Sequence, residues 1–324
     1  MDKKSLMKKL IKIPIPKTSQ PYNFNYFLTH YVFQPWVVEQ EELVRLLKLE
    51  SGQFVLVRVG FSKKPKPILL IDLQSKERLN QAEEKWLVDM ICWNFAVNED
   101  VKEFYEVICQ KDPVLKSASE EIYGAHLRTD PYVFESVIGV ILAQNVFFKR
   151  IYEMNRLLCE KFGERQKFDG KIYYTFPTPE RLAKTDLAQI RTCKVGYRDK
   201  YIKGVAEKII KEKINLDDLR KINNVGQIKQ KLMELPGVGP YTADLAIAIG
   251  FRLPTFHLDL FSREALYTFY FNGKIVPDNK LIEFVDKRWG KWKHHAMLLL
   301  TTNTDSWAKN LGKSFRLKSA AKSI

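Results

Sequence analysis

The 324-residue sequence predicts a mainly helical protein with a smaller antiparallel β domain at its N-terminus. Three observations support this α+β fold class. Between residues 20 and 75, short runs rich in β-branched and aromatic side chains alternate with turns. From residue 81 onward, the apolar residues recur at helical spacing instead. This helical pattern continues nearly to the end, and a block of strands before a block of helices is typical of α+β chains.

The N-terminal β domain is expected over residues 1–80. Its clearest strands are QFVLVRVGF (53–61) and PKPILLIDL (65–73), which are separated by a turn containing Lys and Pro. YNFNYFLTHYVF (22–33) and LVRLLKLES (43–51) are weaker strand candidates. Strands this short that follow one another closely are expected to pair in antiparallel fashion.

The remaining residues, 81–324, are expected to form a helical domain. Its most unusual segment is LMELPGVGPYTADLAIAIG (232–250), where two prolines and two glycines interrupt two helical stretches. The basic end of the chain, 309–324, is interpreted as a frayed tail, and an arm that contacts phosphate is the alternative.

The balance of charged residues favours a polyanionic partner. Lys and Arg number 53 against 38 Asp and Glu, which gives a formal net charge of +15. Nucleic acid ranks first as the partner and an acidic membrane surface second, while a Lys-rich solvated surface is the alternative. No apolar run approaches membrane-spanning length, and the basic N-terminus lacks the apolar region and cleavage site of a secretory signal. We therefore expect a cytoplasmic protein without a membrane partner.

The cysteines and histidines show no pattern of metal ligands. The four cysteines are widely spaced and form no C-x-x-C pair, so they predict a reducing compartment and buried apolar roles. They are Cys92, Cys109, Cys159 and Cys193. His257 and the pair His294–His295 lack carboxylates at ligand spacing in their flanks, so no catalytic metal is expected.

The corner Pro236-Gly237-Val238-Gly239-Pro240 is expected to bind an anion. Pro240 suits the first position of the second helix, because its missing N–H costs little there. The glycines let the backbone turn tightly and leave N–H groups uncovered. Amides at a helix N-terminus attract anions, and on this cationic chain the anion is expected to be a phosphate. The alternative is a tight corner that only packs two helices.

Four motifs in order carry a resemblance to a known family. LPGVGPYTAD resembles the hairpin of a helix-hairpin-helix motif, and its surroundings resemble the HhH-GPD superfamily of DNA base-excision glycosylases. VIGVILAQNVFFKRI (137–151) and CKVGYRDKYI (193–202) are similar to two further segments of that superfamily. RWGKWKHHAMLLL (288–300) resembles the closing helix of the AlkA-like branch, the 3-methyladenine DNA glycosylase II group. That branch and the 8-oxoguanine branch also carry an N-terminal antiparallel β domain.

The resemblance implies a helix-hairpin-helix glycosylase fold, with the active site between two helical subdomains. In the superfamily the hairpin binds one phosphate of double-stranded DNA, and Gly237, Val238 and Gly239 match it here. A monovalent cation, Na⁺ or K⁺, is often held by the hairpin carbonyls, which lie here near Leu235 and Val238. No Cys follows Cys193, so the iron–sulfur cluster of some relatives is not expected, and neither is any redox cofactor.

Asp259, in FRLPTFHLDLFSREAL, matches the catalytic aspartate of the superfamily. A glycosylase breaks an N-glycosidic bond through a transition state like an oxocarbenium ion, and a fixed carboxylate near C1′ stabilises that charge. Asp259 also precedes an amphipathic helix, so a purely structural N-cap is the alternative role. The resemblance favours catalysis.

One position separates two kinds of glycosylase. Enzymes that also cleave the strand as lyases use an amine to form a Schiff base with C1′. In the superfamily this amine is a lysine two residues after the second hairpin glycine. That position is Tyr241 here, and no lysine lies between Leu232 and Lys274. We therefore expect a monofunctional enzyme that leaves an abasic site and has no lyase activity.

Aromatic residues are expected to form the base pocket. An alkylated purine carries positive charge, and aromatic walls bind it by stacking and cation–π attraction. Tyr241 and Trp289 are assigned to the pocket, with core packing as the alternative, and His257 is expected to line or support it. Thr301 stands where the prototype of the alkyl-base branch carries a second pocket tryptophan, so the substrate range stays open.

Further DNA contacts are expected from the segment around residue 145. Gln144 and Asn145 match the turn that, in relatives, fills the gap left by the flipped base, and helix capping is their alternative role. Arg150 aligns with an arginine that reads the opposite base in 8-oxoguanine enzymes. A phosphate contact and a solvated position are its alternatives.

The leading interpretation is a monofunctional DNA glycosylase of base excision repair that acts on double-stranded DNA as a monomer. It would flip out an alkylated base such as 3-methyladenine and hydrolyse its N-glycosidic bond. Two alternatives stay open. One is a glycosylase for deaminated or oxidised bases such as hypoxanthine, uracil or 8-oxoguanine. The other is a DNA-binding helix-hairpin-helix module without catalysis.

Overall fold

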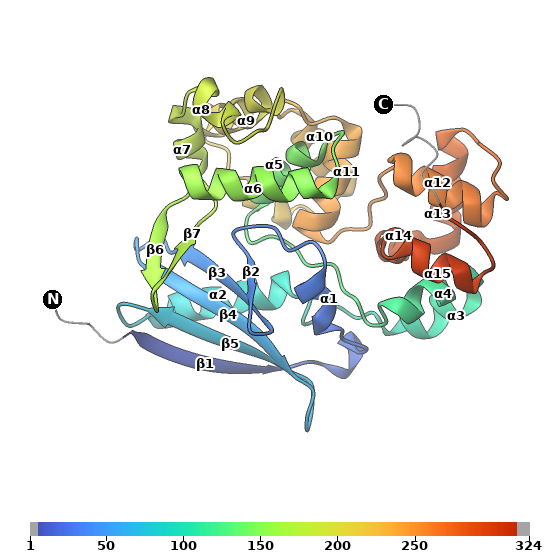
Figure 1. Cartoon of the computed structure of the whole chain (residues 1–324), viewed down its shortest axis with the longest axis horizontal. Coiled ribbons are helices and arrows are strands. Elements are labelled where there is room, and N and C mark those ends of the chain that lie inside the picture. The colour runs from blue at the N-terminus through green and yellow to red at the C-terminus, as the bar shows by residue number, and fades with distance from the viewer. Residues whose placement is uncertain (1–5, 316–324) are drawn as a thin grey trace.

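The computed structural model describes residues 6–315 and confirms the predicted α+β fold class (Figure 1). An antiparallel sheet of five strands precedes a mostly helical remainder, within which there is one small two-stranded hairpin. The part of the predicted basic tail at 316–324 lies outside the described residues. Among the residues described, no helix has the length and apolar character needed to span a membrane.

The strands of the large sheet lie in the order β1-β5-β4-β3-β2, and every neighbouring pair is antiparallel. They are β1 (Met7–Pro14), β2 (Val37–Glu39), β3 (Glu42–Lys48), β4 (Phe54–Ser62) and β5 (Ile68–Ser75). β4 and β5 coincide with the two clearest predicted strands, and β3 coincides with a weaker one. β1 escapes prediction because it is an edge strand with mostly exposed side chains, so burial imposes no alternating pattern on it.

The predicted strand at 22–33 is wrong, because this segment contains the short helix α1 (Phe24–Thr29). The Asn23 side chain caps the helix by accepting a hydrogen bond from the backbone of its first turn. Phe24 and Phe27 are three residues apart, so they share one face of the helix, and both are buried. Aromatic residues favour strands on average, but the cap and the helical spacing prevail here.

Helices make up most of the rest of the chain. The longer ones are α2 (Gln81–Asn94), α4 (Pro113–Glu121), α5 (Val133–Ala143), α6 (Phe148–Phe162), α9 (Arg198–Glu212), α10 (Val225–Met233), α11 (Pro240–Phe251), α12 (Leu260–Tyr270), α13 (Asp278–Trp289), α14 (Lys293–Thr301) and α15 (Thr304–Asn310). Short elements between them are η1 (Lys17–Ser19), η2 (Phe104–Ile108), α3 (Cys109–Lys111), β6 (Arg165–Phe168), β7 (Lys171–Tyr174), α7 (Pro179–Lys184), α8 (Leu187–Arg191), η3 (Leu216–Lys221) and η4 (Gly290–Trp292).

Two large hydrophobic cores divide these elements. One core lies within the α5–α11 body, and the other is shared by the sheet, α2–α4 and the α12–α15 body. Leu87 of α2 and Leu266 of α12, for example, belong to the same core as Val57 of β4. The predicted domain boundary after residue 80 therefore falls at the start of α2 but does not separate two cores. Figure 1 shows the chain crossing from one helical body to the other between α11 and α12.

Candidate active site

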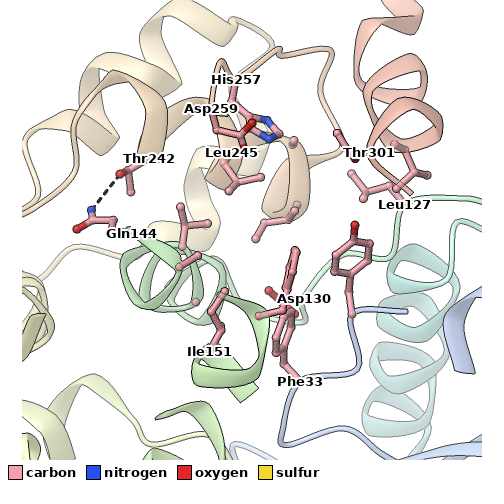
Figure 2. A pocket seen from close by; sticks show the side chains of 18 of the residues that line it. Phe33, Leu127, Asp130, Gln144, Ile151, Thr242, Leu245, His257, Asp259 and Thr301 are labelled. Atoms are coloured by element: carbon pink, nitrogen blue, oxygen red, sulfur yellow. Dashed lines mark hydrogen bonds between the residues drawn. The ribbon is translucent and has the colours of Figure 1, made fainter. Parts of the chain in front are cut away.

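A cavity of about 1110 Å³ lies where the two helical bodies and the loop after α1 meet (Figure 2). The loop contributes Tyr31 and Phe33, the α5–α11 body contributes Tyr241, and the α12–α15 body contributes Thr301. Asp259 lines the cavity from the start of α12. Segments that are far apart in the sequence therefore build one site around a single candidate catalytic carboxylate.

The carboxylate of Asp259 is partly used by its own helix. Oδ1 accepts a hydrogen bond from the backbone N–H of Ser262 at 2.7 Å, and Ser262 Oγ accepts one from the Asp259 N–H at 2.8 Å. This reciprocal capping fixes the side chain at the N-terminus of α12, where the helix dipole stabilises negative charge. Oδ2 has no hydrogen-bond partner within residues 6–315. One oxygen therefore caps the helix and leaves the other available, so the two alternative roles are compatible.

Two uncharged rings lie close to this carboxylate. The rings of Tyr241 and His257 meet edge to face, with their centroids 5.6 Å apart. Burial raises the pKa of Tyr241 to about 12, and the Asp259 charge adds to this effect. Burial also lowers the pKa of His257, although Asp259 and Asp244 oppose the change. Both rings are therefore neutral near pH 7, and Figure 2 shows His257 beside Asp259 at the cavity wall.

The two hairpin glycines have different surroundings. Gly237 has a φ of +77°, and a Cβ built on it would lie 2.4 Å from Cγ of Tyr201, so no other residue fits without a shift. Gly239 is the N-cap of α11, and a Cβ there meets nothing within 4 Å. Val238 is buried, and its N–H donates to the Leu235 carbonyl at 3.1 Å. The corner is therefore tightly packed against Tyr201 at Gly237, whereas the space next to the Gly239 Cα is open.

The turn after α5 is attached to this hairpin. Gln144 Nε2 donates to the Gly237 carbonyl at 2.8 Å and to Thr242 Oγ1 at 3.1 Å (Figure 2). The Gln144 carbonyl accepts a hydrogen bond from the Arg198 guanidinium, which is almost fully buried. Asn145 follows as an exposed residue with a φ of +50°. The structure thus uses the Gln144 side chain to brace the hairpin and presents Asn145 outward.

Arg150 lies in the first turn of α6, away from any strong partner. Its side chain is exposed, and its Nη2 is 3.5 Å from the Lys194 carbonyl. This exposed position is compatible with a contact to DNA.

Sequence reasoning missed two aromatic side chains where the segment after α5 enters α6. Phe147 is 77% exposed and Phe148 is 55% exposed, and both belong to the residues around the cavity. Two adjacent aromatic rings that are both exposed form an apolar patch, and such patches mark interaction sites. The signal was present in QNVFFKR, where two aromatic residues follow a polar turn at a helix start. The contributions of Tyr31 and Phe33 had no local signal, because they depend on the N-terminal loop meeting α6 and α14.

The assignment of Trp289 to the pocket is wrong. Trp289 is 3% exposed and is not among the residues that line the cavity. Its indole N–H donates to the Asp112 carboxylate at 3.3 Å, and its ring packs edge to face on Tyr270. The last turn of α13 faces α4 and α12, so Trp289 belongs to the core. Thr301, at the end of α14, does line the cavity.

No lysine occurs among the cavity-lining side chains of the part of the chain that the structure describes. The charged residues there are Arg45, Arg128, Arg263, Asp130, Glu135 and Asp259. A Schiff base requires a primary amine, which none of these groups supplies. Among residues 6–315, the wall near Asp259 therefore offers a carboxylate and aromatic rings but no amine nucleophile.

Comparison with known proteins gives matches in both sequence and fold. Residues 138–291 match the model of the HhH-GPD superfamily base excision DNA repair protein. The DNA-3-methyladenine glycosylase of Bacillus subtilis is 27% identical over 72% of this chain and 78% of its own length. A probable N-glycosylase/DNA lyase of Methanothermobacter thermautotrophicus is 28% identical over 67% of this chain and 74% of its own length.

The fold also has a solved counterpart. The structure of the 3-methyladenine DNA-glycosylase from Archaeoglobus fulgidus matches with a TM-score of 0.76. At 22% identity, the match covers 90% of this chain and 97% of the other, and it shows that the two share a fold. The family match spans the Gln144 turn, the hairpin and Asp259, which the structure brings together around one cavity. Residues 138–291 therefore belong to the HhH-GPD superfamily of base excision DNA repair proteins, and the relatives support a DNA glycosylase.

Proposed function

We propose that this chain is a monofunctional glycosylase that removes alkylated bases, such as 3-methyladenine, from double-stranded DNA. The observation that carries the proposal is the composition of the cavity wall. Asp259 and Tyr241 both line the cavity, and Tyr241 occupies the sequence position at which lyases of the superfamily carry their lysine. The curated relatives include both a DNA-3-methyladenine glycosylase and a probable glycosylase/lyase, so they support a glycosylase of either type. The residues of the cavity wall are therefore what favours the monofunctional type.

The hairpin supplies the grip on DNA. The open space in front of Gly239, at the N-terminus of α11, gives a phosphate access to backbone N–H groups and to the positive end of the helix dipole. The net charge of +15 adds a general attraction for the DNA backbone. A monovalent cation, held by carbonyls near Leu235 and Val238, would add to this site. The protein acts as a monomer and without an iron–sulfur cluster.

The exposed turn after α5 is suited to fill the space that a flipped base leaves. Asn145 and Phe147 both project from it, and an aromatic ring stacks on neighbouring bases whatever their sequence. Because Gln144 is bonded to the hairpin, it positions this turn and does not enter the DNA itself.

The flipped base would bind against Tyr241 and His257. A cationic base is attracted by the face of an aromatic ring, and a neutral imidazole does not repel it. Asp259 stabilises positive charge as the C1′–N bond breaks and both bonding electrons leave with the base. A water molecule then bonds to C1′ and loses a proton to Asp259 or to solvent. Because an alkylated base departs as a neutral molecule, no general acid is needed.

The test is incubation of the full chain with duplexes that each carry one lesion, including 3-methyladenine, hypoxanthine, uracil and 8-oxoguanine. We expect release of the alkylated base and strand breaks only after later treatment with alkali. Breaks that form without alkali would show lyase activity and contradict the monofunctional assignment. Release of 8-oxoguanine with no release of alkylated bases would contradict the substrate class.

A further inference from the structure

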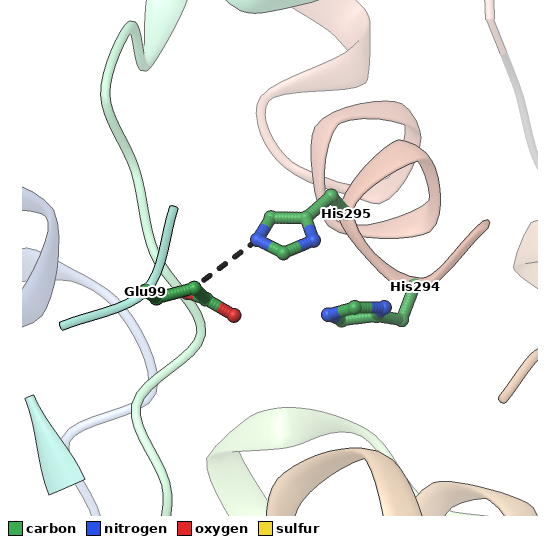
Figure 3. A group of neighbouring side chains, drawn as sticks. All are labelled: Glu99, His294 and His295. Atoms are coloured by element: carbon green, nitrogen blue, oxygen red, sulfur yellow. Dashed lines mark ion pairs between the residues drawn. The ribbon is translucent and has the colours of Figure 1, made fainter. Parts of the chain in front are cut away.

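Glu99, His294 and His295 form a second cluster of functional side chains, which the proposed reaction does not use (Figure 3). Glu99 lies in the loop after α2, and the two histidines lie in the first turn of α14. Their ligand atoms all lie within 4.8 Å of one another. We propose that this Glu99–His294–His295 cluster binds one zinc ion, which ties α14 to the loop after α2.

The hydrogen bonding of the two histidines supports this proposal. None of the four ring nitrogens of His294 and His295 makes a hydrogen bond of normal geometry in the part of the chain that the structure describes, although both rings are buried. The nearest approach is an ion-pair contact of 3.5 Å between His295 Nε2 and Glu99 Oε2. Buried polar atoms are normally paired, so two orphaned imidazoles require an explanation. A metal ion would take a lone pair from each ring.

The donor set is one that zinc prefers. Two imidazoles and one carboxylate bind Zn²⁺ at distances near 2.0–2.2 Å and leave one position of the tetrahedron open. The cluster therefore supplies three donor atoms of the kinds that zinc binds, close enough together to surround one ion.

An outer partner holds Glu99 in place. His126 Nδ1 lies 2.9 Å from Glu99 Oε2, and His126 Nε2 faces the carbonyls of Ser19 and Pro21 at 3.2 and 3.3 Å. Groups that orient a ligand in this way are a regular feature of metal sites. His126 thus links the cluster to the backbone of the N-terminal segment.

Arg252 is the cation that competes for Glu99. Its Nε lies 3.7 Å from Glu99 Oε1, which is too far for a hydrogen bond. The guanidinium donates instead to backbone carbonyls, including that of Trp93 at 2.5 Å. Arg252 is therefore held by the backbone, and Glu99 keeps lone pairs for a second cation.

The cavity gives an ion a route to the cluster. His294 is one of the cavity-lining residues, whereas His295 packs behind it against Phe104 and Trp292. Zinc could therefore enter from the cavity, and water would complete its coordination on that side. The sequence showed no such site because its carboxylate comes from Glu99, almost two hundred residues before the histidines.

Zinc binding can be tested without any measurement of glycosylase activity, so this proposal and the proposed function can fail separately. The untagged full chain would be treated with a chelator and titrated with zinc chloride, with a chromophoric chelator as competitor. We expect one zinc ion per chain and a higher thermal midpoint when zinc is present. A wild-type protein that binds no zinc would overturn the proposal.

Variants then locate the ion. His294→Gln should weaken zinc binding more than about 100-fold, because losing a ligand costs more than losing an outer partner. His30→Gln, at a histidine outside the cluster, should bind zinc as the wild type does. Equal affinity of His294→Gln and wild type would contradict the assignment.

X-ray absorption on the wild-type protein provides a check that needs no variant. Nitrogen and oxygen ligands lie near 2.0–2.2 Å from zinc, whereas a cysteine sulfur lies near 2.3 Å. We expect a shell of nitrogen and oxygen alone. A sulfur shell would place the ion at one of the four cysteines and overturn the proposal.

Discussion

On the hairpin side of the cavity, Asp259 has no ion-pair partner within the described residues, whereas on the sheet side Glu135 is paired with Arg45. Both carboxylates line the same cavity. Asp259 is half-buried and capped by its own helix, while Glu135 and Arg45 are both buried between α5 and β3. Glu135 has a cation beside it within the fold, whereas Asp259 has none among the described residues and keeps its negative potential for a substrate. This contrast supports the proposed catalytic role of Asp259 on the hairpin side of the cavity.

Asp259→Asn should have the largest effect on function. Asparagine caps a helix about as well as aspartate, so the fold should be kept, but the negative charge is lost. We expect base release to fall by about 10²–10³-fold, as when a charge-stabilising group is removed from an active site. Single-turnover base release and DNA affinity would be measured together. Unchanged base release would remove Asp259 from the mechanism.

Glu135→Gln should instead change how stability depends on pH. Burial raises the pKa of Glu135 from 4.5 to about 7, although Arg45 opposes the change. The folded protein then holds this proton more tightly than the unfolded chain, so the free energy of unfolding falls as pH rises from 4.5 to 7. The variant should lack this contribution, which is about 3 kcal/mol at most. Urea unfolding at pH 5 and pH 8 would show it.

The same variant tests the contrast between the two sides of the cavity. Base release by Glu135→Gln at neutral pH should stay within about tenfold of the wild-type rate, because no step uses this carboxylate. A loss as large as that of Asp259→Asn would show that the sheet side takes part in the reaction.

Tyr241→Ala should reduce base release much less than Asp259→Asn does. Loss of a cation–π contact costs about 1–2 kcal/mol, so release of an alkylated cationic base should fall about tenfold. Release of a neutral lesion, where it occurs, should change less. Tyr241→Phe keeps the ring and should behave as the wild type. If Tyr241→Ala affects cationic and neutral lesions equally, the ring has a packing role only.

The parts of the site that sequence analysis located are those encoded locally. The hairpin depends on glycine and proline at fixed spacing, and Asp259 lies next to the helix it caps, so a short window contains the signal. Trp289 could not be placed from sequence, because a tryptophan at helical spacing looks the same whether it faces a pocket or a core. Its true neighbour, Asp112, is far away in the chain.

The N-terminal segment shows that the prediction of the fold from sequence is limited in the same way as the prediction of the site. The aromatic run at 22–33 has the composition of a strand, but its cap and spacing produce α1, and the residues after α1 then turn into the cavity. The arrival of Tyr31 beside Phe148 depends on how the sheet packs against the helices. Such long-range packing leaves no periodic trace in either segment.

The hydrogen bond from the Gln144 side chain to the Gly237 carbonyl holds the turn after α5 at a set distance from the hairpin. If the hairpin holds a phosphate and the neighbouring turn probes the base stack, the distance between these two contacts is set before DNA arrives. The protein would then test each base pair along a duplex without rearranging itself. All the deformation during the search would fall on the DNA, and pairs weakened by damage would yield first.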